Sequence, residues 1–387
     1  MKKTSIYENG LIWFGAAVSI AEILTGTYYA PMGFKEGFLA IIVGHTIGFA
    51  LLYFAGLIGA KSKRTAMETT KLTFGSKGGI IFAILNFLQL VGWTAIMIYD
   101  ASLSSSEIFS FGHTFWAILT GGLIIVWILI GISDLGKVNT VSMALLFVLT
   151  LILSRYIFKI DLSSISPSKE AMSFGGAVEL AVAMPLSWLP LISDYTSNAQ
   201  EGKKSTFISA LIYSVISIWM YTIGMGGALI TGEYSLAAIF GITKLGPLAV
   251  LIIILSTVTT TFLDAYSAGV SFKSIKLNAD EKKVGIMVTI IAIIAAIILP
   301  MDDITDFLYF IGSVFAPMIS IQIADYFILK NEGYTGDYNI LNTTSWILGF
   351  VIYRIILNRE FAVGPTFLVI IITMIITVIL NKVFGKK

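Results

Sequence analysis

Apolar segments, each about 20 residues long, recur along the whole chain and are separated by short polar stretches. A segment of that length can cross the hydrocarbon core of a bilayer as a helix. We therefore expect an all-α integral membrane protein embedded in the lipid bilayer. Reading the apolar runs against the polar breaks predicts twelve spans, at residues 11–31, 37–60, 78–100, 114–133, 138–158, 175–195, 206–231, 246–272, 284–300, 303–329, 341–357 and 365–384.

The connections between these segments are too short to form a separate soluble domain. Residues 1–387 are expected to form a single transmembrane domain, and nothing in the sequence demands more than a monomer. The first ten helices divide into two sets of five, at about 11–158 and about 175–329, followed by two extra helices in 341–384.

The composition supports a membrane protein and excludes several kinds of functional site. The chain is 57% hydrophobic and 12% charged, whereas a soluble domain carries roughly 25% charged residues. It has no cysteine and two histidines, which excludes disulfides, thiolate metal sites and histidine clusters. An enzyme would need a metal cluster or a nucleophile–base pair, and a channel would need rings of like charge or a repeated filter. The sequence shows neither pattern, so we expect a transporter.

The basic residues predict the orientation. With the N-terminus inside, 18 of the 25 Lys and Arg residues fall on the inner side and seven on the outer side. Inner loops of membrane proteins carry this excess, so both termini are expected in the cytoplasm. Because the basic residues sit at segment ends, the net charge of +2 does not indicate nucleic acid binding.

The sixth segment contains "VAMPLSWLPLISDYT" (182–196), in which two prolines flank a serine and a tryptophan. A proline inside a helix removes one backbone hydrogen bond, and in lipid the freed carbonyl must face protein or a wet cavity. A simple proline kink is one interpretation. We favour an unwound segment that binds cargo through Pro185, Ser187 and Trp188.

Glu22 lies in the first segment, eleven residues after Leu11, or ~17 Å along a helix. An ionisable group near the bilayer midplane is costly and usually functional. A structural ion pair or a protonated, hydrogen-bonded carboxyl is the alternative. Discontinuous helices at matching positions of two halves indicate a midplane substrate site in an inverted repeat. We therefore expect helices one and six to be discontinuous.

The third segment supplies a candidate ligand-binding face. In "NFLQLVGWTAIMIYD" the side chains of Asn86, Gln89 and Trp93 share one side of a helix. A tryptophan beside amides suits a flat heteroaromatic ligand, and an ordinary packing stripe is the alternative. On the second segment, His45 is expected to be a packing histidine. Glu179, near the start of the sixth, is expected to reach the outer interface.

The eighth segment, "LSTVTTTFLDAYSAG", supplies hydroxyls and an acid. Thr259 and Thr260 could join carbonyls of an unwound first helix in an oxygen cage for a hard cation such as Na⁺. Bonding of these hydroxyls back to their own helix is the alternative. Asp264 lies one turn beyond Thr260 and is a second acid inside a lipid-spanning segment.

Four stretches of the chain resemble the nucleobase:cation symporter-1 family, the bacterial cytosine and hydantoin permeases. The resemblance covers nearly the full length of the chain and rests on the order and spacing of the stretches together. These stretches are "GLIGAKSKRTAMETTKLTFGSKGG" (56–79), "QLVGWTAI" (89–96), "TTTFLDAYSAG" (259–269) and "FIGSVFAPMISIQIADYF" (310–327).

This resemblance implies a LeuT-like fold of five plus five inverted helices and two more, in a bacterial cytoplasmic membrane. Substrate would lie between spans one, three, six and eight. Trp93 matches the position where the family stacks its heterocycle, Ser187 the unwound stretch that hydrogen-bonds the ligand, and Thr261 a substrate-binding Asn of cytosine permeases. The family's Na⁺ site corresponds here to two hydroxyls and to carbonyls of the first span, those of Thr259, Thr260, Ala17 and Ile20.

The departures from the family affect the expected cargo. The family's Gln lies three residues before the Trp, where this chain has Leu90, and Gln89 is one step earlier. Glu22 and Asp264 are acids where cytosine permeases would have neutral residues. With "SWLPLISDYT", they resemble the branch assigned to the thiamine precursor hydroxymethylpyrimidine.

A carboxyl group can accept a hydrogen bond from the amino group of an aminopyrimidine and share a proton with the adjacent ring nitrogen. We therefore expect Glu22 or Asp264 to bind that edge while Trp93 stacks on the ring. The expected activity is import of a pyrimidine with Na⁺ by alternating access. The alternatives are cytosine or another nucleobase as cargo, and H⁺ as the coupling ion.

Overall fold

The computed structural model describes residues 3–130, 132–162, 165, 168, 171–301, 303–331 and 333–385. Helices lie at all twelve predicted span positions. The described residues also include a 3₁₀ turn, Ala30–Met32, and a π-helical turn, Ala324–Ile328. The α-helices are α1 Ile6–Ala17, α2 Ile20–Thr27, α3 Phe34–Ser62, α4 Ala66–Phe74, α5 Gly78–Ile108, α6 His113–Ile130, α7 Ile132–Ile157, α8 Phe174–Thr196, α9 Gly202–Thr231, α10 Leu236–Gly241, α11 Gly246–Ile275, α12 Glu281–Ile298, α13 Thr305–Ile323, α14 Ile340–Ile356 and α15 Gly364–Phe384.

Length and composition support a multi-pass membrane protein. Within the described residues, nine helices are long and apolar enough to cross a membrane, and the bent pair α1–α2 brings the total to ten. Of the other predicted spans, α14 is a shorter apolar helix of 17 residues, and α12 begins with the charged run Glu281–Lys283. The short helices α4 and α10 connect spans.

The first span is broken, as the sequence predicts. Helix α1 ends at Ala17 and α2 begins at Ile20, with a bend of 47° between the two parts. Ser19 has an extended backbone, and its hydroxyl accepts a hydrogen bond from the backbone N–H of Ala21. It is therefore the N-cap of α2.

The sixth span, by contrast, is one α-helix from Phe174 to Thr196 rather than the discontinuous helix that we expected. Two side chains supply hydrogen bonds in the turn that precedes Pro190. The Ser187 hydroxyl donates to the Met184 carbonyl at 2.6 Å, and Gln89 Nε2 donates to the Ser187 carbonyl at 2.9 Å. Neighbouring polar groups allow a membrane helix to tolerate proline in this way.

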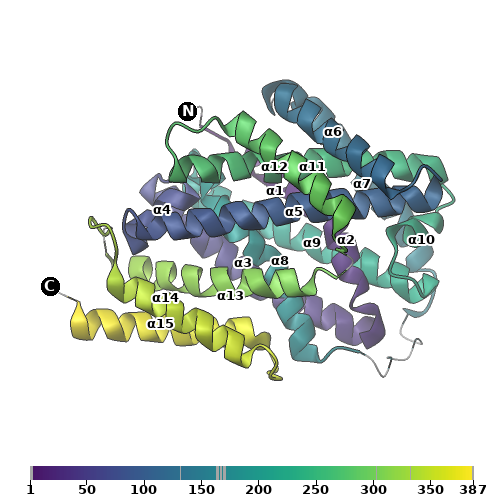
Figure 1. Ribbon diagram of the computed structural model, residues 1–387. Coiled ribbons are helices and arrows are strands. Elements are labelled where there is room, and N and C mark those ends of the chain that lie inside the picture. The colour runs from purple at the N-terminus through teal and green to yellow at the C-terminus, as the bar shows by residue number, and fades with distance from the viewer. Residues whose placement is uncertain are drawn as a thin grey trace.

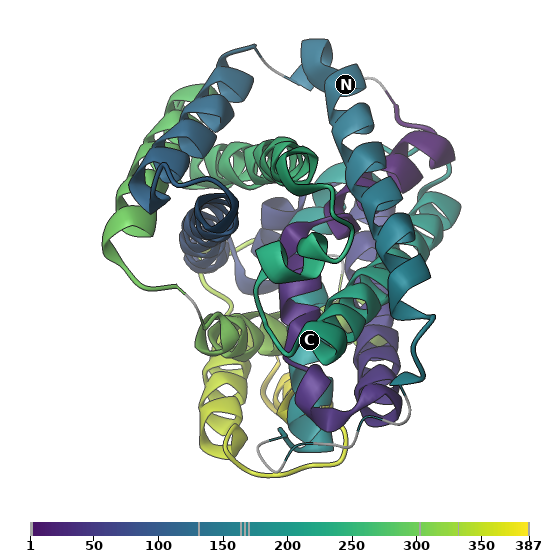
Figure 2. The same cartoon turned by 90° about the vertical axis from the view of Figure 1, so that its right-hand side faces the viewer.

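The helices form two packed groups. Helices α1, α2, α3, α8 and α9 pack together, and α5, α6, α11 and α12 form the second group. In Figure 2 the blue and green α5, α6 and α12 lie to the left of the purple and teal helices, and yellow α15 lies below with α14. Long helices run nearly side by side in Figure 1, with α5 through the middle of the bundle.

The order of elements is the same in both halves of the chain. In each, a short helix separates the second long span from the third: α4 in the first half and α10 in the second. Figure 1 shows these short helices at opposite ends of the bundle. An inverted repeat produces this arrangement. The repeat boundaries, about 11–158 and about 175–329, stay a prediction.

Small residues bring α3 and α8 close together. A Cβ added to Gly44 would lie 2.4 Å from the Ala181 Cβ, and one added to Gly48 would lie 2.5 Å from the Pro185 Cγ. Glycines at helix interfaces permit such approach in membranes, where packing rather than burial from water drives association. The first group of helices is therefore tightly packed around α3.

Candidate functional site

A small cavity of about 30 Å³ lies at the break of the first span, between the two groups of helices. One wall comes from α1, α2 and α8, and the other from α5 and α11. Six of the predicted site residues line it, together with neighbouring apolar side chains and Ser19. The six are Glu22, Trp93, Ser187, Trp188, Thr260 and Asp264.

Glu22 is 1% exposed and both of its carboxyl oxygens are engaged. The Tyr213 hydroxyl donates to Oε1 at 2.8 Å, and the Ser217 hydroxyl donates to Oε2 at 2.6 Å. The Ser217 hydroxyl also lies 2.6 Å from Nε2 of His45, whose Nδ1 is 2.8 Å from the Ile41 carbonyl. His45 is thus a fully hydrogen-bonded packing residue, and the network ties α2 to α9 and α3.

Asp264 is 7% exposed and lines the same cavity from α11. No hydrogen bond joins its carboxyl group to any residue that the structure describes. The two intramembrane acids found in the sequence therefore have different surroundings, although both reach one cavity.

The tryptophans form parts of opposite walls. Trp93 packs edge-on against Phe307, with ring centroids 5.5 Å apart. Trp188 packs against Trp13 at 5.7 Å and against Tyr213 at 6.2 Å, in a cluster that also includes Tyr195. This cluster covers the cavity on the side of the N-terminus, where α1 begins and α8 ends.

Three predicted substrate-binding residues do not line the cavity. Gln89 lies behind the wall, where its Nε2 donates to Asn86 Oδ1 at 2.7 Å and to the Ser187 carbonyl. Pro185 packs against Gly48 of α3, and Thr261 is fully buried away from the cavity. The sequence could not separate these residues from the cavity-lining ones, because a residue type does not say which face of a helix meets a ligand.

The predicted Na⁺ ligands lie on α1, α2 and α11. The hydroxyls of Thr259 and Thr260 both donate to the Ser256 carbonyl at 2.9 Å, so their oxygens keep lone pairs for a cation. Ala17 and Ile20 border the helix break, where the Ala17 carbonyl accepts from the Ser19 N–H at 2.9 Å. Oxygen donors of this kind suit a hard cation. The site itself stays a prediction.

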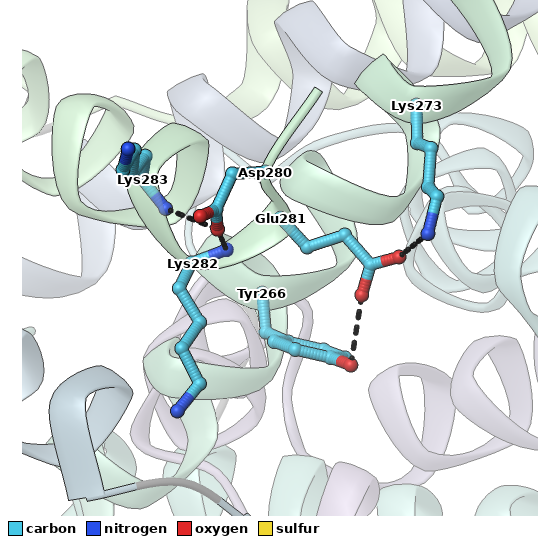
Figure 3. A network of polar contacts seen from close by, with 6 residues as sticks. All are labelled: Tyr266, Lys273, Asp280, Glu281, Lys282 and Lys283. Atoms are coloured by element: carbon cyan, nitrogen blue, oxygen red, sulfur yellow. Dashed lines mark hydrogen bonds and ion pairs between the residues drawn. The ribbon is translucent and has the colours of Figure 1, made fainter. Parts of the chain in front are cut away.

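A polar cluster at the C-terminal end of α11 holds this helix to α12 (Figure 3). Glu281 accepts from the Tyr266 hydroxyl at 3.1 Å and from Lys273 Nζ at 2.8 Å. Asp280 caps α12 by accepting from the backbone N–H groups of Lys282 and Lys283. These contacts hold the helix that carries Thr260 and Asp264 against its neighbour in the second group.

Glu179 does not reach the outer interface as expected. It is 1% exposed, and it accepts hydrogen bonds from the Tyr353 hydroxyl and from both the backbone N–H and the hydroxyl of Thr366. A carboxyl at the start of α15 satisfies free N–H groups of that helix. Glu179 therefore joins α8 to the C-terminal pair, α14 and α15.

Two larger openings lie toward the ends of the bundle. A cavity of about 560 Å³ toward the end that holds α10 is lined by residues that include Asp100, Glu107 and Tyr234. A cleft of about 480 Å³ near α4 is lined by residues that include Arg64, Asp325 and Lys330. The small central cavity is separate from both openings.

The profile of a family described as permease for cytosine/purines, uracil, thiamine, allantoin matches residues 2–345. The chain belongs to the nucleobase:cation symporter-1 family. Among the curated relatives of this permease is the cytosine permease of Escherichia coli K12, which is 22% identical and covers 84% of this chain and 77% of its own. The vitamin B6 transporter TPN1 of Saccharomyces cerevisiae is 22% identical over 86% of this chain and 62% of its own.

Solved structures share the fold of the permease. An inward-facing conformation of Mhp1 superposes with a TM-score of 0.82 at 16% identity, over 98% of this chain and 91% of the other. A substrate-bound outward-open Na⁺-coupled sialic acid symporter gives a TM-score of 0.72 at 16% identity, over 97% and 88%. The LeuT-like fold is thus confirmed. The family consists of permeases, which also confirms the expectation of a transporter rather than an enzyme.

Proposed function

We propose that this permease imports a pyrimidine of the hydroxymethylpyrimidine type together with Na⁺. The observation that carries the proposal is the content of the central cavity. Trp93 and Trp188 offer aromatic surface, Ser187 a hydroxyl and Asp264 a carboxyl group within one site. Flat heteroaromatic ligands bind between such apolar walls and a few convergent polar groups.

An aminopyrimidine fits this chemistry because it offers an amino donor beside a ring nitrogen. A carboxyl group accepts from the first and can share a proton with the second. The edge of uracil presents carbonyl oxygens instead, which a carboxylate would repel. Cytosine is the second candidate, because it carries the same amino edge and because the Escherichia coli relative is a cytosine permease.

Coupling to Na⁺ would use the oxygens of Thr259 and Thr260 with the carbonyls of Ala17 and Ile20. These groups come from both helix groups, so a bound cation would join the two. The permease would then act as a monomer in a bacterial cytoplasmic membrane, with both termini in the cytoplasm. Coupling to H⁺ is the alternative that the experiment must separate.

Uptake into proteoliposomes under a Na⁺ gradient, without a proton gradient, tests the proposal. Radiolabelled hydroxymethylpyrimidine and cytosine are compared in the wild type, in Thr260→Ala and in the control Thr257→Ala. Thr257 is buried on the same helix but does not line the cavity. We expect Na⁺-driven accumulation of hydroxymethylpyrimidine that Thr260→Ala abolishes and Thr257→Ala preserves.

Other results would change the proposal in defined ways. Uptake of cytosine alone would keep the mechanism and replace the cargo. Uptake that ignores Na⁺ but follows a proton gradient would remove the Na⁺ site. Equal loss of uptake in both threonine variants would show that helix stability, rather than cation binding, explains the effect.

A further inference from the structure

The buried acids of this protein differ in one respect that bears on substrate choice. Glu22, Glu179, Asp194 and Asp325 each accept hydrogen bonds from neighbouring groups of the protein. Asp264 is also buried, at 7% exposed, but the structure gives its carboxyl group no such partner within the described residues. Its carboxyl oxygens are therefore free to accept hydrogen bonds from whatever occupies the cavity, a water molecule in the empty protein or a ligand in the loaded one.

A buried acceptor that lacks a donor destabilises the folded protein. Such a group persists where something outside the chain supplies the donor. The cavity beside Asp264 leads to Trp93, Ser187 and Trp188, which are the surfaces that an aromatic ring would contact. The missing donor is thus expected on the ligand, at the edge that faces α11.

Glu22 lines the same cavity but differs from Asp264 in this respect. Its two oxygens already accept from Tyr213 and Ser217. Each carboxyl oxygen of Glu22 therefore has a donor from the protein without any ligand, unlike those of Asp264. Glu22 is accordingly an anchor that holds the broken first span against α9.

We propose that Asp264 is the specificity-determining residue of the permease and that it selects N-heterocycles with an amino donor edge over those with oxo groups. The inference rests on the proposed function, since it assumes a heterocyclic cargo in the central cavity. In its ionised form the Asp264 carboxylate only accepts hydrogen bonds, whereas an amide both accepts and donates. Selectivity therefore arises from rejection of carbonyl edges as much as from attraction of amino edges.

A binding assay on the purified protein in detergent tests this inference without requiring transport. Quenching of tryptophan fluorescence would report binding of hydroxymethylpyrimidine, of its analogue with hydrogen in place of the amino group, and of uracil. The wild type, Asp264→Asn and Glu22→Gln are compared, with thermal melting used to verify folding. We expect removal of the ligand amino group to weaken binding to the wild type about tenfold to a hundredfold, as for a hydrogen bond to a charged group.

The same loss of affinity is expected for Asp264→Asn with the intact ligand. Combining the variant with the ligand that lacks the amino group should weaken binding little more than either change alone. Asp264→Asn should also improve binding of uracil relative to hydroxymethylpyrimidine, because the amide can donate to a carbonyl. Glu22→Gln should lower the melting temperature but leave the ratio of the two affinities near that of the wild type.

Three outcomes would overturn the inference. The first is wild-type protein that binds the analogue without the amino group as tightly as the parent, a result that does not depend on any variant folding. The second is a ratio that changes in Glu22→Gln and not in Asp264→Asn. The third is an Asp264→Asn variant that needs more Na⁺ for binding while the ratio of its affinities for hydroxymethylpyrimidine and uracil is unchanged. That result would make Asp264 a cation ligand. By contrast, selective binding of amino heterocycles without Na⁺-driven uptake would contradict only the proposed coupling to Na⁺.

Discussion

Ser217 on α9 connects two buried side chains that precede it by more than 170 positions, Glu22 on α2 and His45 on α3. Its single hydroxyl oxygen is 2.6 Å from each of them. The network shows why an acid can be kept inside a span: every oxygen has a partner, so burial is not an uncompensated loss of hydration.

Tyr213→Phe should therefore destabilise the protein by about 1–3 kcal/mol, the range for a buried polar group that loses its hydrogen-bond partner. The destabilisation is measured as the change in the free energy of unfolding in detergent. In a double-mutant cycle with Glu22→Gln, the combined loss should be smaller than the sum of the single losses. Tyr53→Phe, which removes a hydroxyl without a hydrogen bond in the described structure, is the control. Strict additivity would show that Tyr213 acts through packing alone.

Gly224 allows α9 to approach α2 at the broken span. A Cβ at this position would lie 1.8 Å from the Ile23 carbonyl oxygen, which belongs to the backbone and cannot move aside easily. Gly224→Ala should destabilise the protein by about 1–3 kcal/mol, as overpacking does. Gly122→Ala, at a position with open space around it, should leave the melting temperature unchanged or higher. Equal melting temperatures for both variants would contradict the close approach.

At the residue scale, sequence reasoning found the acids but not their partners. Glu22 and Asp264 were visible because an ionisable residue contrasts with an apolar segment. Tyr213 and Ser217 were not, because hydroxyl residues are common in spans and their partners are almost 200 positions away. The difference between the two acids could thus be seen only in three dimensions.

At the scale of elements, the two spans predicted to be discontinuous behave differently for a physical reason. The first has no proline at its break, since Pro31 lies well beyond it, yet it breaks after Ala17, where Ser19 caps a new helix at its start. The spacing from Ser19 to Glu22 is that of a capping box, and this signal could have located the break. The sixth has two prolines, yet it stays helical, because Ser187 and Gln89 supply hydrogen bonds.

Ser19→Ala should loosen the start of α2 by removing its cap. The expected loss is about 0.5–2 kcal/mol in the free energy of unfolding, and Ser19→Asn should restore most of it, since Asn is also a good N-cap. Thermal melting in detergent provides the measurement. If the alanine and asparagine variants melt at the same temperature, the cap does not stabilise the break.

At the scale of the whole molecule, the hydrophobic pattern predicted the positions of the spans well, because each span must satisfy its own backbone inside lipid. It could not predict which helices pack together. That grouping depends on close contacts such as Gly44 with Ala181 and Gly26 with Tyr221, whose members are distant in the sequence. The central cavity exists only where the two groups meet.

The proposed orientation can be tested with single cysteines, since the natural chain contains none. Lys203→Cys lies at the exposed start of α9, and Glu36→Cys lies at the exposed start of α3, at the other end of the bundle. A membrane-impermeant maleimide should label position 36 in intact cells and position 203 only after lysis. The reverse pattern would invert the orientation. Labelling after denaturation shows that both thiols are reactive.

The volume of the central cavity, about 30 Å³, corresponds to the space of about one water molecule in the liquid. A pyrimidine ring does not fit there until the two helix groups separate. We therefore expect the empty protein in this conformation to be an electrical insulator, since so small a central cavity interrupts a file of water. A cell could hold many unused copies in its membrane without dissipating the ion gradients that drive other processes.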